Sequence, residues 1–183
     1  GKIKLACMGC EGYNMSDNCW LPDFLFFDDY NNNWDNYQDA IYNIFKADFI
    51  DNPPSFEGKI IKIRWQPIEY DKPEAFFHVT CQDYRKDGER FPDFRRCERI
   101  RWIKAFIQNY KCDSSLCESC DGVKVWKEPY QNKMRVHILL EEEKYIVVVE
   151  PRANYCLLIT AFYFEHDHAL EKKLKHYEKF REQ

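Results

Sequence analysis

Four short apolar segments follow one another in the second half of this 183-residue chain, at residues 123–127, 134–141, 144–150 and 155–165. Each has the length and composition of a β-strand. Only a few polar residues separate the last three segments. Links this short join antiparallel neighbours, because a parallel crossover needs a dozen residues or more. The pattern therefore predicts an antiparallel sheet built from consecutive hairpins.

Helical patterns precede and follow these strands. Apolar residues at three- and four-residue spacing predict helices over residues 33–51, 92–111 and 168–182, with Pro92 at the start of the second. Two further strands are predicted at residues 60–68, with Ile61, Ile63 and Trp65 on one side, and 76–81. Helices, then a meander, then a helix indicate the α+β class.

Charge is unevenly distributed along the chain. Residues 1–57 hold ten acidic residues against three lysines, whereas residues 85–104 hold eight basic residues and four acidic ones. We therefore expect an acidic N-terminal extension with one helix at 1–58 and a main α+β domain at 59–183. No apolar run approaches the roughly 20 residues that cross a membrane, so no membrane partner is predicted.

The nine cysteines include two matching blocks. Cys7 and Cys10 form one C-x-x-C pair and Cys117 and Cys120 the other, each followed by an acidic residue and a glycine. Two such pairs supply the four thiolates of a tetrahedral structural zinc site. The site would clip the N-terminus onto a distant loop.

Other interpretations of the cysteines stay open. They would be free thiols in a reducing cytosol or disulfides in a secreted protein. Cys19 and Cys112 would be the substitute ligands if one of the four cysteines does not bind zinc. Cys81, Cys97 and Cys156 lie in apolar patterns and are expected in the core.

One histidine and an arginine-rich segment suggest a site for a phosphodiester. His78 lies on the strand predicted at 76–81, and histidine exchanges a proton near neutral pH. In the helix predicted at 92–111, Arg96 falls within the apolar stripe of Ile100 and Ile103, and Arg99 at its edge. A guanidinium there needs partners, either an internal carboxylate such as Glu98 or Glu150, or an anionic ligand in a cleft.

Three segments resemble a known family. They are residues 95–103, the hairpin at 145–155 and the closing strand at 158–164, which contains Leu158-Ile159-Thr160-Ala161-Phe162-Tyr163. These segments resemble phage- and toxin-associated nucleases grouped with barnase, EndoU, the colicin tRNases and RelE. The resemblance covers about residues 59–180. It implies helices before a curved antiparallel sheet, followed here by a C-terminal helix.

The resemblance also implies a chemistry. Such nucleases cleave RNA, often tRNA or messenger RNA, without a metal or other cofactor in the reaction. The ribose 2′-hydroxyl attacks the adjacent phosphorus and leaves a 2′,3′-cyclic phosphate. His78 would be the general acid or base, and Arg96 and Arg99 would stabilise charge on the phosphorane. Thr160 would bind a phosphate oxygen, and Tyr163 would assist a proton or stack on a base.

The same resemblance implies substrate-binding roles for three further residues. Arg152 would hold a flanking phosphate, and Arg95 and His137 would also contact the substrate. In that family the position two after Thr160 is often tyrosine, whereas this chain has Phe162. Thr160 and Tyr163 face opposite sides of a regular strand, so both serve one site only if a bulge intervenes.

The sequence thus predicts an endoribonuclease, a toxin or anti-phage effector acting in the cytoplasm of its own or a target cell. An antitoxin or immunity protein is the expected partner besides RNA. The alternative is a non-enzymatic, zinc-containing module that binds nucleic acid or protein, or an inactive phage accessory protein.

The cysteine blocks generate the first prediction. Elemental analysis of the purified protein is expected to find about one zinc per chain, because four thiolates complete a tetrahedral site. Adding a chelator to the native protein should then make four further cysteines reactive in a thiol titration, while those buried in the core stay unreactive. Substoichiometric zinc, with a thiol titration that the chelator leaves unchanged, would contradict the prediction.

Overall fold

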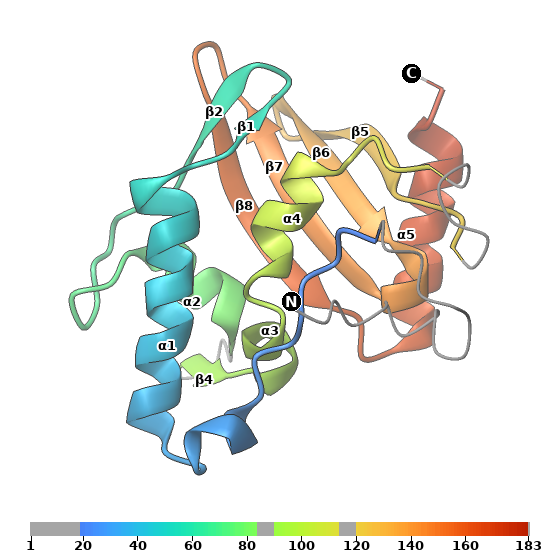
Figure 1. Cartoon of the computed structure of the whole chain (residues 1–183). Coiled ribbons are helices and arrows are strands. Elements are labelled where there is room, and N and C mark those ends of the chain that lie inside the picture. The colour runs from blue at the N-terminus through green and yellow to red at the C-terminus, as the bar shows by residue number, and fades with distance from the viewer. Residues whose placement is uncertain (1–18, 84–89, 114–119, 183) are drawn as a thin grey trace.

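The computed structural model describes residues 19–83, 90–113 and 120–182. It is an α+β structure in which helices pack on one face of a curled sheet and a C-terminal helix covers the other (Figure 1). Within the described residues, every helix is too short or too polar to cross a bilayer.

The sheet contains six strands in the order β1-β2-β8-β7-β6-β5. Strands β5 to β8 form an antiparallel meander, as predicted, while β2 lies parallel to β8. The sheet is therefore mixed, not purely antiparallel. A separate ribbon pairs β3 with β4. The bounds are β1 Ser55–Phe56, β2 Lys59–Lys62, β3 Cys81–Asp83, β4 Arg90–Pro92, β5 Lys124–Tyr130, β6 Lys133–Leu140, β7 Tyr145–Pro151 and β8 Cys156–Tyr163.

Five α-helices complete the described structure, with bounds α1 Trp34–Lys46, α2 Glu74–Thr80, α3 Phe94–Glu98, α4 Trp102–Gln108 and α5 Asp167–Phe180. The Asn33 side chain caps α1 by accepting a hydrogen bond from the Asn36 backbone N–H, and a π-helical turn at Ala47–Asp51 extends the helix. The helices predicted at 33–51 and 168–182 are thus confirmed.

The strand predicted at 76–81 is wrong: His78 lies in helix α2. Every residue of α2 except His78 is buried. The segment therefore lacks the exposed polar face that gives most helices a recognisable 3.6-residue pattern in the sequence. A short, continuously apolar run fits a buried helix as well as a strand. His78 therefore occupies the one position of α2 that reaches the surface.

The single helix predicted at 92–111 is also wrong. Pro92 ends strand β4, Asp93 caps α3, and the chain leaves the helical path between α3 and α4, where Arg99 has φ −103° and ψ 20°. The break lets Arg99 turn inward while Ile103 and Ile107 of α4 still face the sheet.

The strand predicted at 60–68 is shorter than expected. Strand β2 covers only Lys59–Lys62. Ile61 and Ile63 are buried as predicted, but Trp65 is 47% exposed. Trp65 lies beyond the end of β2, so the alternation of buried and exposed side chains along a strand no longer applies to it.

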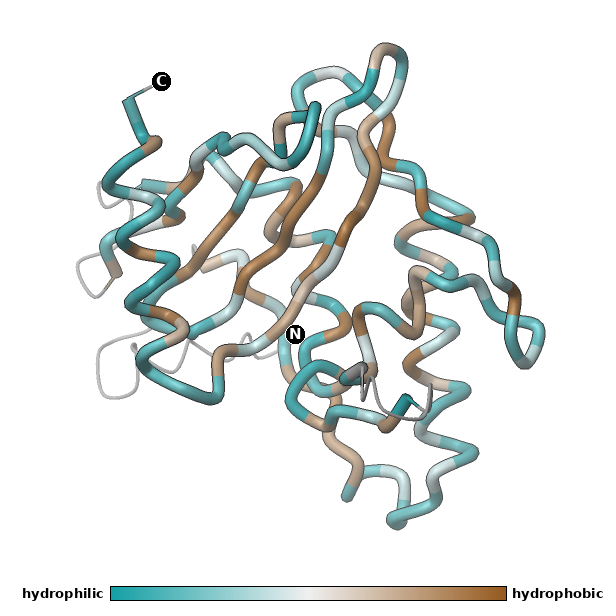
Figure 2. The backbone as a smooth tube through the Cα atoms, turned by 180° about the vertical axis from the view of Figure 1, so that it is seen from behind, coloured by the Kyte–Doolittle hydropathy of each residue, from teal (hydrophilic) through white to brown (hydrophobic). Residues whose placement is uncertain are grey.

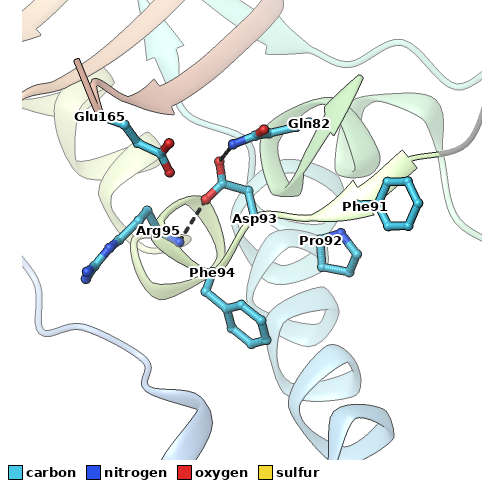
Figure 3. A pocket seen from close by; sticks show the side chains of 7 residues that line it. All are labelled: Gln82, Phe91, Pro92, Asp93, Phe94, Arg95 and Glu165. Atoms are coloured by element: carbon cyan, nitrogen blue, oxygen red, sulfur yellow. Dashed lines mark hydrogen bonds between the residues drawn. The ribbon is translucent and has the colours of Figure 1, made fainter. Parts of the chain in front are cut away.

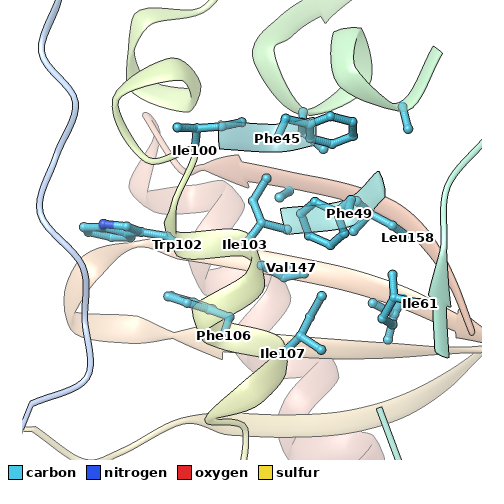
Figure 4. Packing of buried hydrophobic residues seen from close by; sticks show 14 of the residues in the cluster. Phe45, Phe49, Ile61, Ile100, Trp102, Ile103, Phe106, Ile107, Val147 and Leu158 are labelled. Carbon is cyan, nitrogen blue, oxygen red and sulfur yellow. The ribbon is translucent and has the colours of Figure 1, made fainter. Parts of the chain in front are cut away.

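The main core lies between helices α1 to α4 and one face of the sheet. Figure 4 shows α4 side chains such as Ile103 and Phe106 packed against Val147 of β7. Tyr37 and Phe45 of α1 belong to the same cluster, so side chains from both sides of residue 58 share one core. The boundary expected at residue 58 stays a prediction.

A second, smaller core lies under α5. Leu170 packs there with Trp126, Ile146 and Val148 from the other face of the sheet. In the reverse view of Figure 2, apolar residues run along the central strands where the two cores meet them. Cys81, Cys97 and Cys156 are buried, as predicted.

Two isoleucines offer a matched test of the main core. Ile103→Ala is expected to lower the free energy of unfolding by about 2–5 kcal/mol, because Ile103 is 0% exposed and its loss leaves a cavity. Ile68→Ala should cost less than about 1 kcal/mol, because Ile68 is 50% exposed. Urea unfolding of both variants measures the difference, and equal costs would place Ile103 outside the core.

Candidate functional site

The end of strand β8 is where α2 and α3 meet the sheet. Strand β2 pairs with β8 only at Cys156 and Leu157, so the following residues of β8 have no strand neighbour on that edge within the described chain. Helices α2 and α3 pack against β8 and against each other. Three elements from distant parts of the sequence therefore share one corner.

Arg96 of α3 connects these elements. Its Nη1 donates hydrogen bonds to the backbone oxygens of His78, at 3.0 Å, and Cys81, at 2.9 Å. Both carbonyls belong to the C-terminal end of α2, where helix carbonyls lack partners and attract a cation. Arg96 therefore fixes the position of the segment that carries His78.

Two further contacts orient the Arg96 guanidinium. Nε lies 3.4 Å from the Asp93 carboxylate, and the group stands 5.6 Å from the centre of the Phe162 ring of β8. The side chain remains 19% exposed. The internal carboxylate beside Arg96 is thus Asp93, and not Glu98 or Glu150 as expected from the sequence. Its Nε atom is buried and has no hydrogen-bond partner within the described part of the chain.

Arg99 occupies a different environment. Its side chain is 3% exposed, and Nη1 donates to the Arg95 carbonyl at 3.0 Å and lies 3.5 Å from Glu98. The guanidinium is 4.4 Å from the Tyr163 ring centre and also stacks near Phe24 and Trp102. Burial lowers the pKa of Arg99, while Glu98 opposes that shift. In this arrangement Arg99 contacts aromatic rings and not solvent.

A β-bulge lies in β8, as the sequence argument required, but before Thr160. Val149 pairs with Leu158 and Val148 with Thr160, so Ile159 is the extra residue. From Thr160 to Tyr163 the register is regular, and these two residues therefore face opposite sides of the sheet. Thr160 shares its side with Phe162, whereas Tyr163 faces Arg99.

Arg152 lies away from this corner. It precedes the first residue of β8, whereas Thr160 is the fifth of the eight residues of the strand, so about half of the strand's length lies between them. Its guanidinium contacts the buried Glu150 at 2.6 Å, and Arg135 contacts the same carboxylate at 3.0 Å. The two arginines hold the pKa of Glu150 below its usual range against the opposing effect of burial, which is the largest single influence.

His137 is farther still from the corner, beneath α5. It is 5% exposed, stacks on Trp126, and its Nε2 donates to Glu128 at 2.9 Å. The other Glu128 oxygen lies 2.7 Å from Nδ1 of His176 on α5, and Lys173 stands 3.9 Å from the carboxylate. This Glu128 network ties the C-terminal helix to the sheet.

Burial determines the titration of this network. Desolvation lowers the pKa of His137 to about 4, and the nearby Lys173 acts in the same direction. The Nδ1 atom of His137 is buried and has no hydrogen-bond partner among the described residues, so a second ring proton would be unpaired. His137 is therefore neutral at physiological pH and cannot offer a charge to a phosphate.

An open pocket of about 310 Å³ adjoins the corner. It is lined by residues of the β3–β4 ribbon, the start of α3 and the residue two beyond β8 (Figure 3). Asp93 belongs both to this pocket and to the Arg96 contacts. The lining residues are Gln82, Phe91, Pro92, Asp93, Phe94, Arg95 and Glu165.

Sequence reasoning identified only Arg95 among the residues of this pocket. The Asp93 carboxylate accepts hydrogen bonds from the backbone N–H groups of Arg95 and Arg96 and from the Gln82 side chain. An aspartate directly after Pro92 and before a helical pattern is a cap signal that was available in the sequence. Glu165 carried no comparable signal.

Three of the four expected zinc ligands, Cys7, Cys10 and Cys117, lie outside the described residues. Cys120 is described, and its Sγ accepts a hydrogen bond from the Gly122 N–H at 3.3 Å. Gly122 has φ +83°, and a Cβ there would stand 2.6 Å from the Asp113 backbone. Glycine is thus required in the second cysteine block, while the zinc site stays a prediction.

Comparisons with protein-family models, with curated proteins and with solved structures find no match to this chain.

The Glu128 network generates a pH prediction. Because the folded-state pKa of His137 lies below the unfolded value, the folded protein binds that proton less readily. The stabilisation is complete above pH 6.5 and is lost as pH falls toward 4. Urea unfolding should show the free energy of unfolding falling by roughly 1–3 kcal/mol over this range.

A variant isolates the His137 contribution. His137→Gln retains a donor toward Glu128 but does not titrate, so its stability should change less between pH 7 and pH 5. His168→Gln, at an exposed position of α5, should keep the wild-type slope. An unchanged slope in His137→Gln would assign the pH dependence to other groups.

Proposed function

We propose that this chain is a metal-independent endoribonuclease that cleaves RNA through its own 2′-hydroxyl. The supporting observation is the convergence, at the end of β8, of the His78-bearing end of α2 with Arg96 and the polar part of the strand. The pocket beside Arg96 offers adjoining space for a substrate.

In the proposed reaction the 2′-oxygen attacks phosphorus as its proton is removed, and the 5′-oxygen leaves with a proton. The products carry a 2′,3′-cyclic phosphate and a 5′-hydroxyl. His78 would transfer one of these protons, since it is the one residue of α2 that reaches the surface. Arg96, whose side chain is partly exposed, would stabilise charge on the phosphorane.

The other predicted residues fit the proposal unequally. Thr160 lies on the same face of β8 as Phe162, whose ring stands near the Arg96 guanidinium, and Thr160 would bind a phosphate oxygen. Arg99 and Tyr163 stack on each other on the opposite face, which suits them to position the strand. Arg152, beyond the other end of β8, would reach only a distant phosphate of a long substrate.

The proposal also includes the nuclease family to which the chain would belong and its biological role. Helices before a curled sheet and a helix after it agree with a relationship to the barnase–EndoU–colicin–RelE nucleases. On that basis the substrate would be tRNA or messenger RNA in the cytoplasm, and an antitoxin or immunity protein would control the activity. A zinc clip through the two cysteine blocks would anchor the N-terminus.

One observation favours a second candidate. Arg96 Nη1 already donates to two backbone carbonyls, and Arg99 is buried among aromatic rings, as expected for structural arginines. In that reading the chain is a non-enzymatic module, zinc-containing or not, that binds nucleic acid or protein, or an inactive phage accessory protein.

Cleavage assays separate the two candidates. Incubating the protein with total RNA in EDTA is expected to give fragments ending in 2′,3′-cyclic phosphate. His78→Ala should lower turnover by about 10²–10⁴-fold, because it removes general acid–base catalysis, and leave RNA affinity within about tenfold. End-group analysis and single-turnover kinetics provide the measurements.

His168→Ala is the matched control, since His168 is exposed on α5 and remote in sequence from α2. Circular dichroism verifies that both variants fold. RNA binding without any cleavage by the wild-type protein would reject the nuclease and support the binding module. Equal turnover of wild type and His78→Ala would remove His78 from the mechanism.

A further inference from the structure

The segment between β2 and α2 forms a protruding arm, defined here as residues 64–73 (Figure 1). At its base, the backbone oxygens of Arg64 and Trp65 accept hydrogen bonds from the first two residues of α2. At its tip, Glu69 and Lys72 exchange two backbone hydrogen bonds of 3.1 and 2.9 Å. Bonds at both ends give the arm a defined shape outside the core.

Large apolar side chains are exposed on this arm. Tyr70 at the tip is 84% exposed, Ile68 is 50% exposed and Trp65 is 47% exposed. Tyr70 also has φ 51°, in the left-handed region that a bulky residue rarely adopts. Backbone strain of this kind is concentrated at functional positions, and exposed apolar groups close together indicate an interaction surface. The arm therefore has the properties of a docking element.

Carboxylates flank Tyr70 on both sides. Glu69 and Asp71 are exposed. Lys72 is directed back to the arm, because its Nζ donates to the Tyr70 carbonyl at 3.3 Å and lies 5.2 Å from the Tyr42 ring centre. The tip thus presents a phenol between two negative charges. Anionic lipid headgroups would repel such a tip, whereas an apolar pocket with a cation at its rim would attract it.

The pocket beside Arg96 has such walls. Its volume of about 310 Å³ admits one aromatic side chain. Phe91 is 50% exposed and Phe94 is 43% exposed, so both rings are accessible from solvent. Phe94 is supported from behind by Phe27 and Tyr37, with ring centres 5.2 and 6.3 Å away. A supported ring offers a firm surface for a second aromatic ring.

Polar groups at the same pocket complement the tip. The Arg95 side chain is 59% exposed and 3.5 Å from Glu98, so its guanidinium has further N–H donors for a carboxylate. Glu165 is exposed, and Figure 3 shows its side chain extending toward Asp93. The Asp93 charge is compensated by Arg96, whose Nε lies 3.4 Å away. A cation and a hydrogen-bond acceptor are therefore both present beside the rings.

We propose that the Tyr70 tip of one copy of this chain occupies the pocket of a second copy. The Tyr70 ring would stack on Phe94, its hydroxyl would donate to Glu165, and Glu69 would pair with the Arg95 guanidinium. Tyr70 is exposed on its own chain, so the pocket that it fills belongs to another copy.

The contact joins two different surfaces of the chain. Copies therefore associate either by reciprocal exchange of two arms or by head-to-tail repetition. The assembly does not depend on the proposed nuclease activity, although it would cover the pocket beside Arg96.

Sedimentation velocity of the full chain over a range of concentrations tests the contact. Wild type is expected to shift reversibly to larger species as its concentration rises to about 1 mM, because a small interface binds weakly. Tyr70→Ala should weaken self-association at least about tenfold, since it removes the anchoring ring. Met134→Ala, which removes an apolar side chain of 42% exposure on β6, should associate like wild type.

Charge reversal identifies the surface that receives the tip. Glu69→Arg and Arg95→Glu should each weaken self-association at least about tenfold, because each brings like charges together. Mixing the two variants should restore association, since the arm of each then meets a pocket of opposite charge in the other. Glu171→Arg, at an exposed position of α5, should associate like wild type.

Three results would overturn the proposal. They are a wild-type chain that stays monomeric up to about 1 mM, self-association that Tyr70→Ala leaves unchanged, and no recovery in the mixture of charge variants. A monomer that co-sediments with anionic vesicles through Tyr70 would instead assign the arm to a membrane surface. Circular dichroism verifies that each variant folds. No readout requires RNA cleavage, so failure of the proposed function leaves this test intact.

Discussion

The hydrogen bonds from Arg96 to the end of α2 are the contacts on which the corner of the molecule depends. They connect α3 to the backbone of His78 and Cys81, while the same guanidinium touches Asp93 and the Phe162 ring of β8. A cation beside unpartnered helix carbonyls is favourable. One side chain thereby sets the relative position of two helices and a strand, and with them the proposed cleavage site and its pocket.

Three other buried charged groups in the described part of the chain have close partners. Glu150 is shared by Arg135 and Arg152, Glu128 by His137, His176 and Lys173, and Arg99 is enclosed by aromatic rings. Removing one partner of such a group leaves an uncompensated charge, which costs more than the pair itself contributes. These networks explain why Arg99, Arg152 and His137, each chosen for its chemistry, have structural contacts.

The candidate site was only partly readable from the sequence. The structure brings the Arg96 guanidinium to the backbone oxygen of His78. The sequence nevertheless predicted a strand at His78, because a seven-residue helix that is buried at every other position has no readable polar period. The pocket was missed except for Arg95. Gln82, Phe94 and Glu165 come from separate segments, and no spacing rule brings them together.

The sequence by itself determined the hairpin meander of β5 to β8, helix α1 and the C-terminal helix, because short polar links and regular apolar periods act locally. Only the tertiary structure decided that β2 lies parallel to β8, that the chain breaks between α3 and α4, and that the Arg96 side chain stays partly exposed while that of Arg99 is buried. These features depend on packing between residues that are far apart in the sequence, and on which carbonyls and aromatic rings surround each charged group. The spacing of residues within one segment contains no information about such contacts.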